Sequence, residues 1–248
     1  MPNAAPALLL PDSQFDTFRQ QRTLVDGFDD YVSGRRWTLV GAEFTATLTA
    51  AAAGLQGGQL VMAPAAATLN HETYLYRTVS QMLFEDNVSF IVKGRIKAAQ
   101  AATDKMALHF GLMSAPAADT IVDTTGVPKS SFSGALIYTK AGSIYWQAGC
   151  SVGAGLITSA SSKVAGGSSI QNLEIHIKCT NGIAEVTYFV DGAQLLDEST
   201  IYSNPIKHSL TYSGAAAMTG YFGMKQCSAV SQPFTILGYA EQIAYGSW

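Results

Sequence analysis

The chain has 248 residues, of which 48% are hydrophobic and 13% charged, and its net charge is −3. A chain of this length and apolar content can fill one large core, while its charged share is about half of the roughly 25% that is usual. The longest basic cluster is Arg35-Arg36, and apolar runs stay below the roughly 18 residues that span a membrane, which argues against nucleic-acid partners and membrane spans.

The beginning of the chain differs in composition from the rest. Residues 1–35 contain three prolines within the first eleven positions, followed by a polar stretch with helical potential. We expect an N-terminal arm, extended or forming a short helix, with a disordered tail as the alternative. The residues expected to dock this arm on a neighbouring subunit are Phe15, Phe18, Arg19 and Arg22. The first residues lack the basic start of a signal peptide, so we expect no export signal.

From residue 36 onward, apolar residues recur at every second position, which is typical of strands with one face in a core. Clear runs of this kind span residues 90–97, 106–112, 174–179 and 185–190. Asn181-Gly182 and Asp191-Gly192 lie between such runs and match type I′ turns, which need positive φ at both central positions. The sequence therefore predicts a three-strand antiparallel meander over residues 173–197.

The strands follow one another without alternating helices, which rules out a parallel sheet in practice. Many antiparallel strands over about 210 residues predict an all-β fold, a two-sheet antiparallel jelly-roll sandwich spanning residues 36–248. Residues 114–134 contain two prolines and several Asp and Ser residues, and are expected to form a long surface loop. Residues 159–169 are rich in Ser and Gly and are also expected to be a loop.

Several short motifs occur in a defined order along the chain. They are Phe28-Asp29-Asp30, Arg36-Trp37, Gly57-Gly58 with the strand after it, and the segments 90–97, 109–112, 173–177 and 186–192. This series, over residues 28–243, resembles concanavalin A-like (laminin G-like) jelly rolls, particularly those encoded by tailed phages. The resemblance implies one of three roles: a sugar-binding lectin, a glycan hydrolase, or a head-decoration or fibre part of a virion. Fold alone does not choose among these roles.

Glycan hydrolases on this fold need two carboxylates about 5–5.5 Å apart, which positions i and i+2 of one strand can supply. Glu72, Glu174 and Glu185 each stand alone in their strands. The chain has no G-x-S-x-G motif for a nucleophilic serine, and His109 and His176 are expected on the wetter faces of their strands. The sequence therefore predicts a protein that is not an enzyme.

Cofactor sites are not predicted, because no His, Asp and Glu residues have the spacing of a metal site. A calcium-binding loop bordered by Asp104, Asp119 and Asp123 is an alternative to scattered, solvated carboxylates. The odd number of cysteines and the lack of a CxxC motif predict buried free thiols. These cysteines are Cys150, Cys179 and Cys227.

The low charge, the expected docking arm and the phage-like motif order favour a structural role. We expect a virion structural protein of a tailed bacteriophage, a capsid decoration (cement) protein on the outer head surface, assembled in the host cytoplasm. Its expected partners are the major capsid protein or other virion proteins, and further copies of itself in a homo-oligomer.

The alternative role is a glycan- or receptor-binding lectin-like domain of a tail fibre or spike, with a cell-surface glycan as its partner. An exposed aromatic ring can stack on a sugar ring, although large aromatics more often fill the core. Tyr145 and Trp146 are adjacent in a strand, so one of them points outward, and both are candidates for glycan contact.

Overall fold

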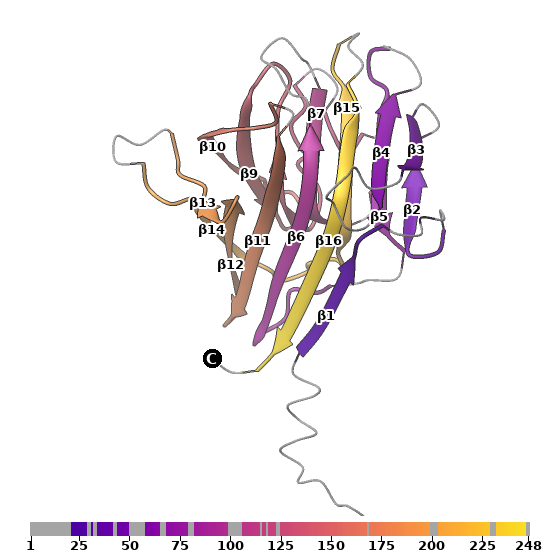
Figure 1. Cartoon of the computed structure of the whole chain (residues 1–248). Helices are drawn as coiled ribbons and strands as arrows, with labels where there is room; N and C mark the ends of the chain where they lie inside the picture. The colour runs from indigo at the N-terminus through magenta and orange to yellow at the C-terminus, as the bar shows by residue number, and fades with distance from the viewer. Residues whose placement is uncertain are drawn as a thin grey trace, which may run out of the picture.

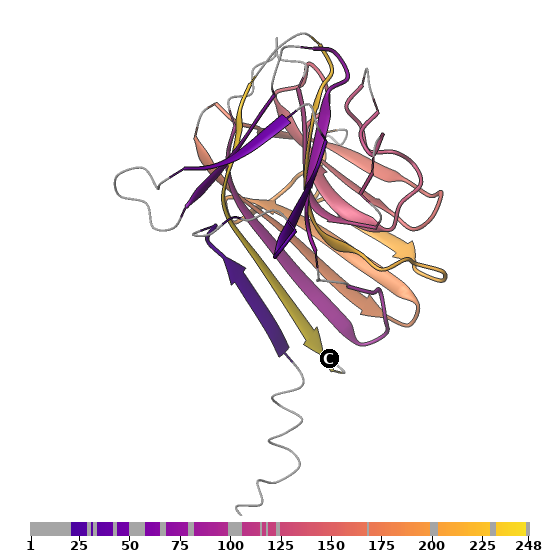
Figure 2. The ribbon, with the colours of Figure 1, turned by 90° about the vertical axis from the view of Figure 1, so that its right-hand side faces the viewer.

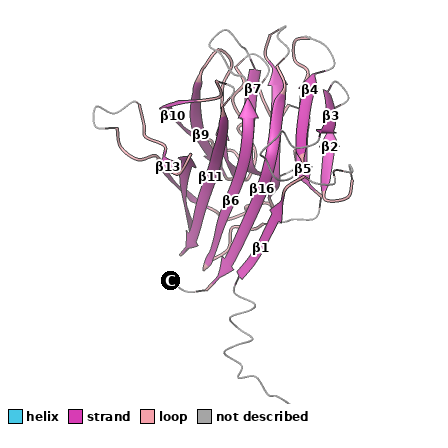
Figure 3. Ribbon diagram, viewed as in Figure 1, coloured by secondary structure: helices cyan, strands magenta, loops and turns pink. Residues whose placement is uncertain are grey.

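The computed structural model describes residues 21–28, 31, 34–41, 44–49, 58–64, 68–78, 82–98, 106–114, 116–117, 119–122, 125–167, 169–198, 203–228 and 232–246. These residues form sixteen strands, and no helix is found among them (Figure 3). Within this part of the chain, nothing helical is long and apolar enough to cross a membrane.

The strands follow in chain order. They are β1 (Gln21–Asp26), β2 (Trp37–Val40), β3 (Phe44–Thr49), β4 (Gln59–Pro64), β5 (Glu72–Arg77), β6 (Val88–Ala98), β7 (Met106–Met113), β8 (Gly134–Tyr138), β9 (Tyr145–Ser151), β10 (Ile157–Val164), β11 (Ile170–Thr180), β12 (Ile183–Val190), β13 (Ala193–Gln194), β14 (Lys207–Thr211), β15 (Thr219–Gln226) and β16 (Phe234–Tyr245).

Two antiparallel sheets pack face to face, which confirms the predicted all-β sandwich. The nine-stranded sheet has the order β13-β12-β11-β6-β16-β4-β3, with β1 paired to β16 and β14 paired to β12. The seven-stranded sheet has the order β10-β9-β8-β7-β15-β5-β2. Figure 1 shows β12, β11, β6, β16 and β1 side by side, and Figure 2 shows the two sheets as separate layers.

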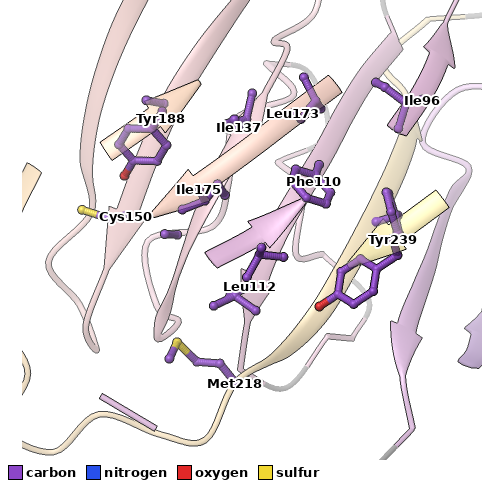
Figure 4. Close-up of a cluster of buried hydrophobic side chains, with 14 of the residues drawn as sticks. Ile96, Phe110, Leu112, Ile137, Cys150, Leu173, Ile175, Tyr188, Met218 and Tyr239 are labelled. Atoms are coloured by element: carbon purple, nitrogen blue, oxygen red, sulfur yellow. The ribbon is translucent and has the colours of Figure 1, made fainter. Parts of the chain in front are cut away.

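The core fills the space between the sheets, because alternate residues of each strand point inward. In β6, Phe90, Val92, Gly94 and Ile96 are buried, whereas Ile91, Lys93 and Arg95 are partly or fully exposed. Figure 4 shows Phe110 of the seven-stranded sheet close to Ile175 of the nine-stranded sheet, within one apolar cluster. Burial of these side chains is the main source of stability for such a fold.

Both predicted hairpin turns are confirmed by backbone geometry. Asn181 and Gly182 have φ of 53° and 75°, and Asp191 and Gly192 have φ of 54° and 77°. These values fit the left-handed conformation that a type I′ turn requires. The predicted meander over residues 173–197 is therefore present as β11, β12 and the two-residue strand β13.

Part of the segment expected to be an N-terminal arm belongs to the sandwich. Residues 21–26 form β1, which pairs with β16, so this segment is a strand rather than a helix. Asp26 is buried and accepts hydrogen bonds from Trp37 Nε1 and from the Phe28 backbone N–H, both at 2.9 Å. Arg22 is exposed on β1. The other docking residues, Phe15, Phe18 and Arg19, lie outside the described residues.

The described part of the segment expected to be a long surface loop, residues 114–134, lies over the outer side of the seven-stranded sheet up to the start of β8 at Gly134. Its residues Ile121 and Phe132 are buried in a second apolar cluster with Tyr74 and Tyr221. The prediction of a purely surface loop is therefore wrong, because this sheet has apolar side chains on both faces.

Below this segment, Lys225 is only 1% exposed, and its Nζ donates to Glu72 Oε2 at 2.8 Å and to the Ile121 carbonyl at 3.0 Å. Asp119 of the proposed calcium loop lies near the same ammonium group, at 3.8 Å. Asp104 and Asp123 lie outside the described residues, and the part of the chain that the structure describes contains no cluster of three or more metal-ligating side chains. The buried Lys225–Glu72 ion pair ties the covering segment to the sheet, because Lys225 also donates to the Ile121 carbonyl of that segment.

His109 was expected on the wetter face of its strand, and this prediction is wrong because the covering segment buries it. The imidazole is 1% exposed, and its Nε2 lies 2.9 Å from the Gly126 carbonyl oxygen. Burial lowers the pKa of His109 to about 4.

The three cysteines are free and buried, as predicted: Cys150, Cys179 and Cys227.

Candidate functional site

The outer face of the nine-stranded sheet carries most of its polar side chains on three long strands. The antiparallel register places Glu174 of β11 opposite Lys93 of β6 and Phe189 of β12. Residues that pair directly across an antiparallel ladder point to the same side of the sheet. We call this surface the polar face and define it by the outward residues Ser89, Ile91, Lys93, Arg95, Asn172, Glu174, His176, Lys178, Glu185, Thr187 and Phe189.

Two hollows lie on the polar face. The larger has a volume of about 650 Å³ and lies over β6, β11, β12 and β14, with Ile91, His176 and Thr187 in its lining. The smaller has a volume of about 310 Å³, lies over β1, β16, β6 and β11, and includes Lys93 and Glu174. Both volumes fall within the roughly 300–1,000 Å³ that is usual for small-ligand sites.

A hydrogen-bonded group of side chains, which we call the ridge, joins the linings of the two hollows, with His176 in the larger and Lys93 and Glu174 in the smaller. Glu174 Oε2 lies 3.1 Å from Lys93 Nζ and 3.1 Å from His176 Nε2. The His176 ring in turn packs on Phe189, with ring centroids 4.6 Å apart. Burial raises the pKa of Glu174, but hydrogen bonds from His176 and Lys93, together with their charges, outweigh it and leave the pKa below its ordinary value. The ridge therefore holds an ionised carboxylate beside a half-buried aromatic ring.

Such an arrangement suits a ligand with both apolar and hydroxyl-bearing surfaces. The Phe189 ring, partly exposed beside the His176 imidazole that packs on it, offers an apolar contact. Glu174 and Lys93 offer an acceptor and donors within one side-chain length of it. A second ion pair, Lys207 Nζ to Glu185 Oε1 at 2.6 Å, borders the larger hollow. No covalent chemistry is required for such a site to bind its ligand.

The glycan-contact candidates from the sequence lie elsewhere, on β9 of the other sheet. Tyr145 is 38% exposed at the start of β9, opposite the exposed Val164. Trp146 is 1% exposed, and its Nε1 donates to Gln171 Oε1 at 3.1 Å. The proposal of Trp146 as a glycan contact is therefore wrong, because neither face of its ring reaches solvent.

A serine–histidine pair, which sequence reasoning missed, lies at one side of the sandwich. Residues 159–169 were expected to be a loop, but residues 159–164 belong to β10 (Ile157–Val164), so that part of the prediction is wrong. Ser159 Oγ lies 3.0 Å from His208 Nε2. His208 Nδ1 lies 3.0 Å from the Tyr188 hydroxyl oxygen. The run Ile157-Thr158-Ser159-Ala160 has no apolar–polar alternation, so the β-branched Ile157 and Thr158 are the local signal that favours a strand here.

The chain matches no family model and no curated protein. It is similar in structure to peanut lectin in complex with a 9mer peptide, at 10% identity over 92% of this chain and 100% of that chain, with a TM-score of 0.56. It is similar to an endo-1,3-beta-glucanase from Streptomyces sioyaensis, at 9% identity over 99% of this chain and 100% of that chain, with a TM-score of 0.56.

A third similar structure is a carbohydrate esterase from the Shiga toxin-encoding bacteriophage phi24B. Its identity is 14% over 84% of this chain and 90% of that chain, with a TM-score of 0.52. Together the three similarities show that this chain has the concanavalin A-like jelly-roll fold of lectins and glucanases. Identities this low show the fold and do not carry over an activity.

These similarities correct the prediction that the protein is not an enzyme. That prediction relied on missing strand carboxylates and a missing serine motif, yet the same fold occurs in a glucanase and in a carbohydrate esterase. A nucleophile and a base can also be brought together from distant strands, which a local motif does not detect. Ser159 and His208 are 49 positions apart in this chain.

Proposed function

We propose that this protein is a carbohydrate-binding module that holds a glycan on its polar face. The observation that carries the proposal is the ridge of Lys93, Glu174, His176 and Phe189, which joins the linings of two hollows of ligand size. A pyranose ring has an apolar face of C–H groups and a rim of hydroxyls, so it needs both a platform and hydrogen-bonding groups. The similarity to lectins supports this choice over other small ligands.

In finer detail, we propose that the glycan belongs to a bacterial cell surface and that this chain is the receptor-binding domain of a phage tail fibre or spike. The phage esterase of the same fold supports this setting. Capsid decoration stays a prediction from the sequence. Cosedimentation of the protein with capsids lacking it would decide between the two settings, since a glycan binder of the tail would not saturate the head surface.

A glycan array with purified protein tests the binding function. We expect a defined set of bound glycans, and a loss of affinity of about tenfold for Phe189→Ala, because an aromatic contact contributes about 0.5–1.5 kcal/mol beyond its buried area. Glu174→Gln should weaken binding by a similar factor, since it replaces a charged acceptor with a neutral amide.

Tyr145→Ala is the matched control, because it removes an exposed aromatic ring from the other sheet. Unchanged binding by Tyr145→Ala together with weakened binding by Phe189→Ala would support the polar face. The reverse pattern would move the site to the start of β9, and an array without any bound glycan would contradict the proposed function.

A further inference from the structure

Ser159, His208 and Tyr188 come from three strands that meet at one side of the sandwich. Ser159 lies on β10, the edge strand of the seven-stranded sheet, and pairs with the buried Ala148. Its side chain therefore points toward the space between the sheets. His208 on β14 pairs with the buried Val186 of β12, so it points into the same space from the nine-stranded sheet.

The hydrogen bonds of this group allow two tautomers of the imidazole, of which one suits nucleophilic catalysis. The Tyr188 hydroxyl lies 3.2 Å from the Gly149 carbonyl oxygen and 3.0 Å from His208 Nδ1. When the hydroxyl donates to the Gly149 carbonyl, Nδ1 carries the ring proton and donates to the hydroxyl oxygen. In this tautomer Nε2 is unprotonated and accepts from the Ser159 hydroxyl, at 3.0 Å. Burial raises the pKa of Tyr188 well above its ordinary value, which keeps this donor protonated.

We propose that Ser159 and His208 are the nucleophile and the general base of a site that hydrolyses short-chain carboxylic esters. With the ring proton on Nδ1, the pair has the polarity that nucleophilic catalysis requires: a hydroxyl donates to an imidazole whose second nitrogen is held by a third group. The short chain follows from the position of Ser159, which is only partly exposed and has the core directly behind it. This activity goes beyond glycan binding and uses none of the polar-face residues.

In the first step, Ser159 Oγ bonds to the ester carbonyl carbon, its proton passes to His208 Nε2, and the carbonyl π electron pair moves to the carbonyl oxygen. The oxygen lone pair then re-forms the carbonyl as the C–O bond to the alcohol breaks, and the alcohol oxygen takes the proton from Nε2. Solvent water bonds to the acyl carbon and gives a proton to Nε2, while the carbonyl π pair moves to oxygen again. That pair re-forms the carbonyl as the bond to Oγ breaks, the carboxylic acid leaves, and Oγ takes the proton from Nε2.

The surroundings of the pair set its pH range and its speed. The charged or titratable groups near His208 are Tyr188 from β12, Cys150 from β9 behind that tyrosine, and Asp197 before β14. Burial lowers the pKa of His208 to about 4, against a smaller opposing effect of Asp197. The imidazole is thus a neutral but weak base near neutral pH, so hydrolysis should be slow and should favour activated esters.

The outer edge of β10 supplies a candidate donor for the developing oxyanion. The Ala160 carbonyl accepts from the Glu198 backbone N–H, so it points away from β9. In an antiparallel strand the N–H and C=O of one residue point to the same edge. The Ala160 N–H, one residue from Ser159, therefore points to the outer edge, which residues 197–198 flank through the bridge between Ser161 and Asp197. Backbone donors in such a position stabilise the tetrahedral intermediate of acyl transfer.

Two measurements on the full chain test the proposal. The first is labelling with diisopropyl fluorophosphate, followed by intact mass and peptide mapping. The second is the initial rate of p-nitrophenyl acetate hydrolysis against pH. We expect one phosphoryl group on Ser159 and a rate that falls at least about 100-fold in Ser159→Ala and in His208→Gln. Ser162→Ala is the matched control, an exposed serine on the same strand, and should keep the wild-type rate.

The pH profile separates a catalytic pair from a structural one. A rate that depends on His208 should fall on the acid side near pH 4, where that imidazole becomes protonated. Failure of Ser159 to react in the folded wild-type protein, or labelling of another residue, would overturn the proposal without any variant. A Ser159→Ala rate equal to that of the wild type would also overturn it. Glycan binding on the polar face would be unaffected by either result.

Discussion

Two buried histidines should make this protein sensitive to mild acid. His109 is 1% exposed under the segment that covers the seven-stranded sheet, and His208 is 5% exposed between the sheets. Burial is the main cause that lowers the pKa of each imidazole to about 4 from the ordinary 6.5. In the unfolded chain both rings regain their ordinary pKa and bind protons more readily than in the folded state.

The direction and the size of the pH effect on the free energy of unfolding follow from this difference between the folded and unfolded pKa values. Because the folded-state pKa is the lower one, the stabilisation is complete above about pH 6.5 and is lost as the pH falls toward about 4. A difference from 6.5 to about 4 corresponds to about 3 kcal/mol for each histidine at full effect. By about pH 4.5 the two together should remove about 5 kcal/mol, which is comparable to the 5–15 kcal/mol that stabilises a typical domain.

Urea unfolding, followed by circular dichroism between about pH 7 and pH 4.5, measures this effect. His109→Gln keeps an N–H donor for the Gly126 carbonyl, so its free energy of unfolding should fall only about half as steeply with pH as that of the wild type. Ser162→Ala is the control and should keep the full slope. A wild-type stability that stays flat over this range, or an unchanged slope in His109→Gln, would refute the reasoning.

Two further substitutions test the buried polar contacts. Trp37→Phe removes the N–H that Asp26 accepts at 2.9 Å, so we expect a loss of about 1–3 kcal/mol in urea unfolding, and equal stability would contradict this. Lys225→Met leaves Glu72 buried without its ion-pair partner and should cost about 3–5 kcal/mol. Adding Glu72→Gln should recover part of that loss, and a double variant as unstable as the single one would argue against the pair.

The sequence was sufficient where a local signal decides the structure. The alternation in residues 90–97 and 174–179 predicted β6 and β11 correctly, because each strand has one face in the core and one near solvent. Asn181-Gly182 fixed the hairpin that follows β11, since few residues adopt positive φ at both positions. The same alternation located the polar face, although it did not show which outward residues meet.

Sequence reasoning failed where the structure depends on contacts between distant segments. In β7 every residue is buried, because the described part of the covering segment, with Ile121 and Phe132, packs on the face that alternation assigned to solvent. His109 was misplaced for this reason. The sequence did not decide whether Trp146 lies in the core or on the surface. Alternation indicates that one of the neighbours Tyr145 and Trp146 points into the core, but it does not indicate which one. Only the paired register of two sheets settles such questions.

The outer surfaces of the two sheets differ, and this difference places the two proposed sites. A loop segment covers the outer side of the seven-stranded sheet, so we expect a ligand at the polar face of the other sheet or at the outer edge of β10, beside residues 197–198. Strand β12 borders both places: alternation turns Phe189 toward the polar face and Tyr188 toward His208. Phe189→Ala should therefore weaken glycan binding and leave ester hydrolysis unchanged. Tyr188→Phe should slow hydrolysis and leave glycan binding unchanged, because adjacent strand positions face opposite sides.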